Sequence, residues 1–112
     1  MHNYKKLEVW QRSMDLCVKV YGICRQLPSE EKFGMYSQLT RSSVSISANI
    51  AEGCGRQHPK EFKQFLSIAL GSCYETETHL ILLHRVGFLK QGDIFSDLET
   101  LQRMLRGLIR NL

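Results

Sequence analysis

A Glu–His pair is the first arrangement in this sequence that could do chemistry. Glu75 and His79 are four residues apart, which places them one turn apart on a helix, and Glu77 lies nearby. In a helical bundle this pattern invites comparison with carboxylate-bridged di-iron sites, which need a Glu-x-x-His motif on each of two helices. No Glu-x-x-His motif occurs in the sequence. We therefore expect a surface Glu–His pair, with no metal site and no cofactor.

Three arginines near the C-terminus could bind phosphate. Arg103, Arg106 and Arg110 follow the spacing i, i+3 and i+7, which places their guanidinium groups on one side of a helix. No acidic residue lies between positions 101 and 112, so this side is uniformly cationic. Such a stripe is suited to a phosphate backbone. The alternative is a set of solvated cations that stabilises the negative end of the helix dipole.

A second basic cluster surrounds the turn between the second and third predicted helices. It consists of Arg56, His58, Lys60 and Lys63. The free backbone amides at the start of a helix could add to a phosphate site here. The alternative is an ordinary solvated loop.

Motifs for catalysis are missing from the sequence. No serine lies in a Gly-x-Ser-x-Gly motif, no glycine-rich phosphate loop is present, and no acid–base couple occurs at a fixed spacing. We therefore expect a protein that is not an enzyme. The cysteines never form a Cys-x-x-Cys pair, which argues against redox or zinc chemistry. They are expected to be buried reduced thiols, namely Cys17, Cys24, Cys54 and Cys73.

Length and composition predict one globular domain over residues 1–112. The chain has 43% hydrophobic and 23% charged residues, which are ordinary values for a folded domain. No apolar run approaches the roughly 20 residues of a transmembrane helix, and acidic residues close to the start argue against a signal peptide. We therefore expect a cytoplasmic protein without a membrane partner. The net charge of +4 favours polyanionic partners.

Four amphipathic helices are expected to position these residues. The first runs from about Leu7 to Gln26 and ends before a proline, and the second runs from the Ser29 N-cap to about Gly53. The third runs from Pro59 to Gly87, and the fourth starts at a cap on Asp93. Short loops join them, so we predict an all-α, antiparallel up-down-up-down four-helix bundle.

Stripes of apolar residues with spacings of three and four are expected to face the core. They are Leu7, Trp10, Met14, Cys17, Tyr21 and Cys24 in the first helix; Phe33, Leu39, Ile46 and Ile50 in the second; Phe62, Leu66, Ala69, Cys73, Thr76, Leu80 and Leu83 in the third; and Ile94, Leu98, Leu101, Leu105, Leu108 and Leu112 in the fourth. Small residues in the second helix let a neighbour come close. Gly53 and Gly55 are expected to end this helix in the left-handed conformation.

Apolar residues outside these stripes suggest self-association. One thin bundle cannot hide all of them, so a second copy of the chain is the expected cover. The alternative is that they are scattered on the surface of a monomer. These residues are Val9, Val20, Ile23, Ile81, Leu82, Phe95 and Ile109.

A distinctive set of short segments runs from position 38 to 72, with one more at the entry to the first helix. The segments are Leu7-Glu8-Val9-Trp10, Gln38-Leu39-Thr40-Arg41, Val44-Ser45-Ile46, Ala48-Asn49-Ile50-Ala51-Glu52-Gly53, Gly55-Arg56, Lys60-Glu61-Phe62, Phe65-Leu66 and Ala69-Leu70-Gly71-Ser72. Together they resemble the four-helix-bundle family of 23S rRNA intervening-sequence proteins, and the resemblance covers nearly the whole chain. Two positions depart from the family pattern: Ser47 replaces a proline, which implies a less kinked helix, and His58 replaces a serine or threonine at the cap of the third helix.

This resemblance implies a ring-like homopentamer, similar to the accessory variability protein of diversity-generating retroelements, which binds nucleic acid and a reverse transcriptase. Other members are encoded within insertions in bacterial 23S rRNA genes. We therefore expect a homo-oligomer that binds RNA or DNA non-specifically through its basic faces. The alternative is a protein-interaction adaptor with no role in nucleic-acid binding. Within the motif, Asn49 and Glu52 are expected to lie between helices and to pair internally or across a subunit boundary, beside Gly53.

Overall fold

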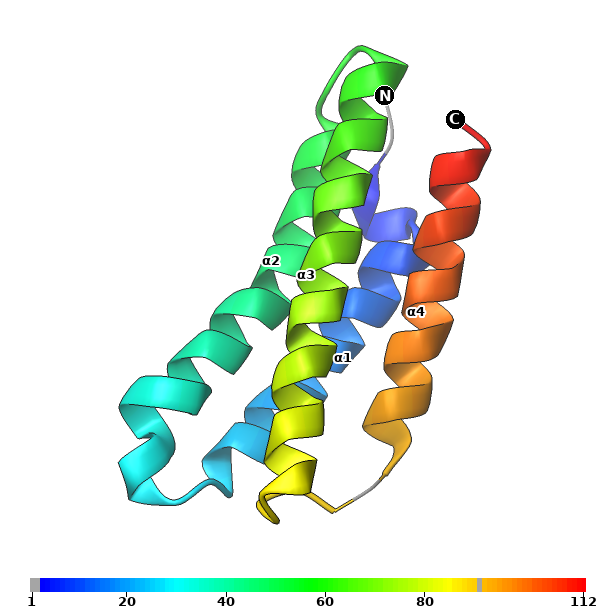
Figure 1. Ribbon diagram of the computed structural model, residues 1–112. Helices are drawn as coiled ribbons and strands as arrows, with labels where there is room; N and C mark the ends of the chain where they lie inside the picture. The colour runs from blue at the N-terminus through cyan, green and yellow to red at the C-terminus, as the bar shows by residue number, and fades with distance from the viewer. Residues whose placement is uncertain (1–2, 91) are drawn as a thin grey trace.

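Four helices alternate in direction along the chain, so that each is antiparallel to the next (Figure 1). The computed structural model describes residues 3–90 and 92–112, except for the side chains of residues 31–33. The helices are α1 (Glu8–Arg25), α2 (Ser37–Cys54), α3 (Pro59–Arg85) and α4 (Asp93–Arg110). No strand occurs in the described residues. The predicted all-α, antiparallel four-helix bundle is therefore confirmed.

The connection from α1 to α2 differs from the prediction of one helix starting after Ser29. A 3-10 turn, η2 (Ser29–Glu31), is followed by a π-helical turn, η3 (Lys32–Tyr36), before α2 begins. Gly34 lies within this stretch, and glycine has the lowest α-helix propensity of any residue except proline. The Thr40 hydroxyl then donates to the Tyr36 carbonyl at 2.9 Å at the start of α2. The predicted inward position of Phe33 lies outside the described side chains.

The stripe predicted for α1 is rotated away from the observed one. Met14 and Tyr21 are 40% and 37% exposed, whereas Val9 and Val20 are buried. The observed stripe also follows spacings of three and four, but it contains Ser13, which is buried and hydrogen-bonded. Cys17 and Cys24 of the predicted stripe are buried, but the prediction for Met14 and Tyr21 is wrong, because Ser13 interrupts the apolar pattern of the buried face in the sequence. The buried residues of α1 are Val9, Ser13, Leu16, Cys17, Val20 and Cys24.

The stripes of α3 and α4 follow the prediction closely. All seven predicted residues of α3 are buried, from Phe62 to Leu83. In α4 the first four are buried, together with Gln102. Leu112 is 43% exposed, because α4 ends at Arg110 before another turn can bring this side chain to the core. These side chains join those of α1 and α2 in one buried cluster.

Gly53 allows α2 and α3 to approach closely beside the turn that connects them. A Cβ atom built on Gly53 would lie 2.8 Å from Cβ of Phe65 and 3.0 Å from Cδ1 of Phe62. The helix continues through Gly53 to Cys54, and the C-cap Gly55 has φ of −81°. The predicted left-handed ending is therefore wrong, because the glycine is needed for interhelical contact rather than for a positive φ. Among the described residues, Gly87 has a positive φ, of 88°.

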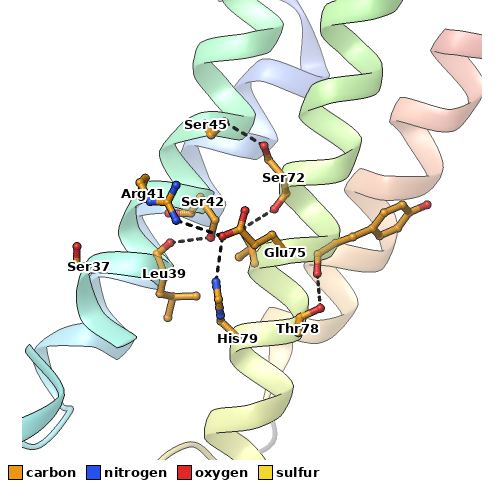
Figure 2. A network of polar contacts seen from close by, with 12 residues as sticks. Ser37, Leu39, Arg41, Ser42, Ser45, Ser72, Glu75, Thr78 and His79 are labelled. Carbon is orange, nitrogen blue, oxygen red and sulfur yellow. Dashed lines mark hydrogen bonds and ion pairs between the residues drawn. The ribbon is translucent and has the colours of Figure 1, made fainter. Parts of the chain in front are cut away.

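Hydroxyl groups line the contacts of α2 with both of its neighbours. Ser45 and Ser72 share a hydrogen bond of 3.0 Å across α2 and α3, and this pair is drawn in Figure 2. On the other side, Ser13 and Ser47 share a buried bond of 2.9 Å between α1 and α2. In the part of the chain described here, every buried side-chain nitrogen or oxygen atom has a partner. Small polar side chains thus let the helices approach while their hydroxyls remain bonded.

Candidate nucleic-acid interface

The antiparallel topology brings the two predicted basic clusters to the same end of the bundle. The α2–α3 turn, the C-terminus of α4 and the start of the chain all lie toward this end (Figure 1). This convergence could have been derived from the sequence, because in an up-down bundle the end of the second helix, the start of the third and the end of the fourth coincide. We call this region the basic end, defined as residues 3–12, 52–63 and 100–112.

The charge of the molecule is concentrated at the basic end. Nine of the fifteen lysines and arginines lie there, with three of the eleven acidic residues, which gives a formal charge of +6. The remainder of the chain carries six cations and eight acids, a charge of −2. Two of the three acids are in ion pairs with an arginine four residues further along the chain, Glu8 with Arg12 at 2.9 Å and Glu52 with Arg56 at 3.0 Å. The whole positive excess therefore lies at one end.

One residue of the arginine stripe of α4 contacts α3. Arg106 donates from Nη1 to the hydroxyl of Tyr74 on α3 at 3.0 Å. Arg103 has a 67% exposed side chain and lies 3.8 Å from Glu99, which is a long ion pair between exposed groups. Arg110 is exposed in the last turn of the helix. All three guanidinium groups are therefore open to solvent on one side of α4.

The residues of the α2–α3 turn are divided between two environments. Arg56 stacks over the Phe65 ring, with Cζ 4.8 Å from the ring centroid, and pairs with Glu52. Lys60 and Lys63 are exposed in the first turns of α3. Arg56 is therefore held against the protein, while both lysines are free to meet a ligand.

His58 caps α3, which resolves the uncertainty raised by its replacement of serine or threonine. Its Nδ1 atom accepts a hydrogen bond from the backbone N–H of Lys60 at 3.2 Å. Pro59 occupies the first helical position, where its fixed φ is favourable. His58 therefore shapes the start of α3 and leaves one of the amides at this helix start already bonded.

The three residues of the predicted structural motif have different roles. Asn49 donates to the Ser45 carbonyl at 2.8 Å and to the Ser45 hydroxyl at 3.0 Å, which supports the serine bridge to α3. Glu52 does not lie between helices as expected, because it is exposed and bonded to Arg56. Gly53 allows the close contact of α2 with Phe65 of α3 that is described above.

The Glu–His pair lies on α3, and all four cysteines lie in buried positions. Glu75 pairs with His79 at 3.2 Å and with Arg41 of α2 at 3.6 Å (Figure 2). Within the described residues, no three His, Cys, Asp or Glu side chains are grouped as metal ligands. Burial raises the pKa of the Cys24 thiol to about 11 and that of the Cys73 thiol to about 12, so both stay protonated at neutral pH. All four cysteines are free and buried, as predicted.

Tyr74 was missed by the sequence analysis. This residue is 43% exposed, and its position beside Arg106 depends on the register between α3 and α4. No short-range pattern in the sequence reports that register.

The chain is an all-α four-helix bundle, and a fold of this class does not by itself define an activity. Residues 5–108 match the 23S rRNA-intervening sequence protein family, and the chain therefore belongs to this family. A solved structure from Bacteroides thetaiotaomicron, described as a protein with unknown function from the S23 ribosomal protein family, superimposes with a TM-score of 0.82. The two are 30% identical, over 90% of this chain and 97% of that chain. No curated protein matches the sequence.

None of the helices formed by the described residues is long and apolar enough to cross a bilayer.

Proposed function

We propose that this protein is a non-enzymatic, homo-oligomeric nucleic-acid-binding protein whose basic end contacts phosphates without reading sequence. The phosphate partners are Arg103, Arg106, Arg110, Lys60 and Lys63, with Arg56 beside them. The single observation that supports this function is the segregation of charge, +6 at the basic end against −2 elsewhere. A polyanion is the ligand that this distribution attracts most strongly.

Indifference to base sequence follows from the geometry of the basic end. The cations lie on helix ends and on one side of α4, and none of the motifs that insert a recognition helix into a groove is present in the sequence. Binding of this kind depends on counterion release, so its affinity falls as salt rises. The four free, buried thiols fit the reducing cytoplasm, which we propose as its location.

The test is the affinity for a fluorescein-labelled 30-nucleotide RNA, measured by fluorescence anisotropy from 30 to 300 mM KCl. We expect a linear fall of log K with log salt, with a slope of about −0.7 per phosphate contact for a single strand. The variant Arg103→Glu/Arg106→Glu/Arg110→Glu should bind much more weakly, with a shallower slope by about 2.

A matched control makes the same change of charge at the other end. Arg41, Arg85 and Lys90 are exposed and lie away from both the basic end and the α1–α2 groove, so Arg41→Glu/Arg85→Glu/Lys90→Glu alters the net charge equally. This control should retain most of the wild-type affinity. Equal losses in the two variants would mean that net charge alone matters, and retention of full affinity by the first would remove the arginine stripe from the interface.

The homo-oligomeric part of the proposal is supported by an apolar groove between α1 and α2. The groove has a volume of about 360 Å³. Four large apolar side chains along it are exposed, with Val18 at 67%, Val44 at 44%, Met14 at 40% and Tyr21 at 37%. A homopentameric ring, as the family resemblance implies, would cover this surface and add the fields of the basic ends. Its lining residues are Met14, Cys17, Val18, Tyr21, Arg25, Val44 and Ser47.

The same groove favours a second candidate function, a protein-interaction adaptor. An amphipathic helix of another polypeptide, such as the reverse transcriptase implied by the resemblance, could occupy it in place of a second copy. Under this function the RNA affinity would be negligible at 150 mM KCl. The anisotropy experiment therefore separates the two candidates.

A further inference from the structure

Tyr74 presents an aromatic ring to solvent beside the arginine stripe. The residue is 43% exposed, and its hydroxyl accepts a hydrogen bond of 3.0 Å from Nη1 of Arg106. Tyr21 and Phe88 are the other aromatic residues among the strongly exposed large apolar side chains of the described residues. Tyr21 lines the α1–α2 groove, and Phe88 follows α3 at the opposite end of the bundle. Tyr74 is thus the exposed aromatic ring that contacts the basic residues.

The cations near Tyr74 form a track along the α3–α4 side of the molecule. Lys63 precedes Tyr74 by eleven residues, close to three full helical turns, so the two share one face of α3. Arg110 lies one turn beyond Arg106 toward the basic end, and Arg103 lies one turn before it. Because α3 and α4 are antiparallel, the track runs from Arg103 past Tyr74 to Lys63 over about 20 Å.

Phosphate binding alone gives no reason for an exposed aromatic ring within such a track. A duplex presents phosphates on its outside and hides the faces of its bases within the stack. Proteins that bind single strands instead combine a cationic track with aromatic rings on which unpaired bases stack. The bond from Arg106 fixes the position of the Tyr74 hydroxyl, so less rotamer freedom is lost when a base stacks on the ring.

We propose that Tyr74 and Arg106 form a stacking platform for an unpaired base, so that the preferred ligand of the basic end is single-stranded nucleic acid. This inference rests on the proposed nucleic-acid-binding function and narrows its ligand. Lys63, Arg103 and Arg110 contact the phosphates on either side of the stacked base. Arg56 takes no part in the platform, since its guanidinium group already stacks on Phe65.

The test compares three labelled probes on the full chain at 100 mM KCl. They are a 12-nucleotide oligo(dT), a 12-base-pair duplex, and a 12-unit abasic deoxyribose-phosphate strand, which has the phosphates without the bases. Wild type should bind oligo(dT) more tightly than either of the other probes. Tyr74→Ala should weaken oligo(dT) binding by about 5- to 100-fold and leave duplex and abasic binding within about twofold.

Two further variants separate stacking from other effects of the substitution. Tyr74→Phe keeps the ring and should retain most of the affinity for oligo(dT), whereas Tyr74→Leu keeps an apolar side chain without the ring and should behave like Tyr74→Ala. Far-ultraviolet circular dichroism establishes that each variant is folded. Sedimentation velocity establishes that its mass is that of wild type.

The outcomes distinguish this inference from the function on which it rests. If wild type binds none of the probes, the proposed function fails and the inference fails with it. If the triple glutamate variant of α4 loses binding while Tyr74→Ala binds oligo(dT) as wild type does, nucleic-acid binding stands and the stacking platform is overturned. If Tyr74→Ala loses affinity for the duplex and for oligo(dT) by the same factor, the stacking platform is also overturned.

Discussion

Gly53 of α2 and Phe65 of α3 pack so closely that a Cβ atom on the glycine would lie 2.8 Å from that of the phenylalanine. Real Cβ atoms do not approach so near, and the next closest atom, at 3.0 Å, belongs to the Phe62 ring in the buried core. This contact lies next to the α2–α3 turn, which carries Arg56 and His58. The spacing of α2 and α3 at this point therefore determines where the basic residues of the turn lie.

Replacement of Gly53 by alanine should destabilise the protein. The added methyl group overpacks the contact, which lowers the free energy of unfolding by about 1–3 kcal/mol. The higher helix propensity of alanine offsets about 1 kcal/mol of this loss. Gly71→Ala is a matched control in the middle of α3, where nothing lies within 4 Å of the new Cβ atom, and it should stabilise by about 0.5–1 kcal/mol. Urea unfolding followed by circular dichroism measures both. Equal changes in unfolding free energy for the two variants would contradict the close contact between Gly53 and Phe65.

Replacement of His58 by alanine should weaken the start of α3. The substitution removes the acceptor for the Lys60 N–H, and loss of an N-cap side chain costs about 0.5–2 kcal/mol. His58→Ser restores an acceptor, so its stability should equal or exceed that of wild type. Thermal unfolding at pH 8 compares the three proteins, and an alanine variant as stable as the serine variant would show that the cap contributes nothing.

The Ser13–Ser47 hydrogen bond should appear as a coupling energy between α1 and α2. Each serine is buried, and the two hydroxyls are 2.9 Å apart. A double-mutant cycle with Ser13→Ala and Ser47→Ala should give a coupling of about 0.5–1.5 kcal/mol, since each single change leaves the other hydroxyl short of one partner. Ser96→Ala, at an exposed position of α4, combined with Ser13→Ala is the control pair. The two changes in unfolding free energy should add in this pair. A zero coupling for Ser13 and Ser47 would contradict the bond.

The buried thiols should make the protein less stable at high pH. Burial raises the folded-state pKa of Cys24 to about 11 and of Cys73 to about 12, above the unfolded value of about 8.5. The unfolded state therefore loses thiol protons first, so stability is intact below about pH 8.5 and falls as pH rises toward 11, by up to about 1.4 kcal/mol per pH unit for each thiol. Urea unfolding between pH 7 and 10.5 measures this slope. Cys73→Ala should show a shallower slope, and an unchanged slope would exclude Cys73 as a contributor.

A charge in the α1–α2 groove should prevent self-association. Val18 is 67% exposed on the groove, so Val18→Glu leaves the core intact but places an ionised carboxylate in any interface formed there. Light scattering after size-exclusion chromatography should give an oligomer for wild type and a monomer for the variant. Ser96→Glu, at an exposed position of α4, is the control and should keep the oligomeric mass of wild type. An oligomeric Val18→Glu variant would move the interface elsewhere.

Sequence periodicity predicted α3 and α4 well and α1 poorly, for a physical reason. In α3 a single stripe of apolar residues recurs every three or four positions from Phe62 to Leu83, so its core face has no competitor. In α1 two neighbouring stripes compete, and the buried one includes Ser13 in place of an apolar residue. That serine is buried because Ser47 of α2 satisfies its hydroxyl, and such a partner is invisible until the helices are packed.

In the candidate site, too, the residue types were predictable from the sequence, whereas contacts that depend on helix packing were not. The six basic residues were identifiable from charge and spacing, and their common end follows from antiparallel topology. The contact of Tyr74 with Arg106 depends on how far α4 is shifted along α3, and that shift is set by core packing between the helices. The exposed Glu52 shows the converse, because a position that looked interhelical in the sequence lies on the outer side of α2, with Arg56 one turn away.

The separation of charge along the bundle gives the molecule a permanent electric dipole. In the field of a nucleic acid, the torque on this dipole turns an approaching protein so that its cationic end leads. A larger share of collisions then begins in a productive orientation, which raises the association rate constant at low ionic strength. Dissolved ions screen this torque beyond about 10 Å at 0.1 M, so added salt should slow the encounter of the proposed complex as well as lower its affinity.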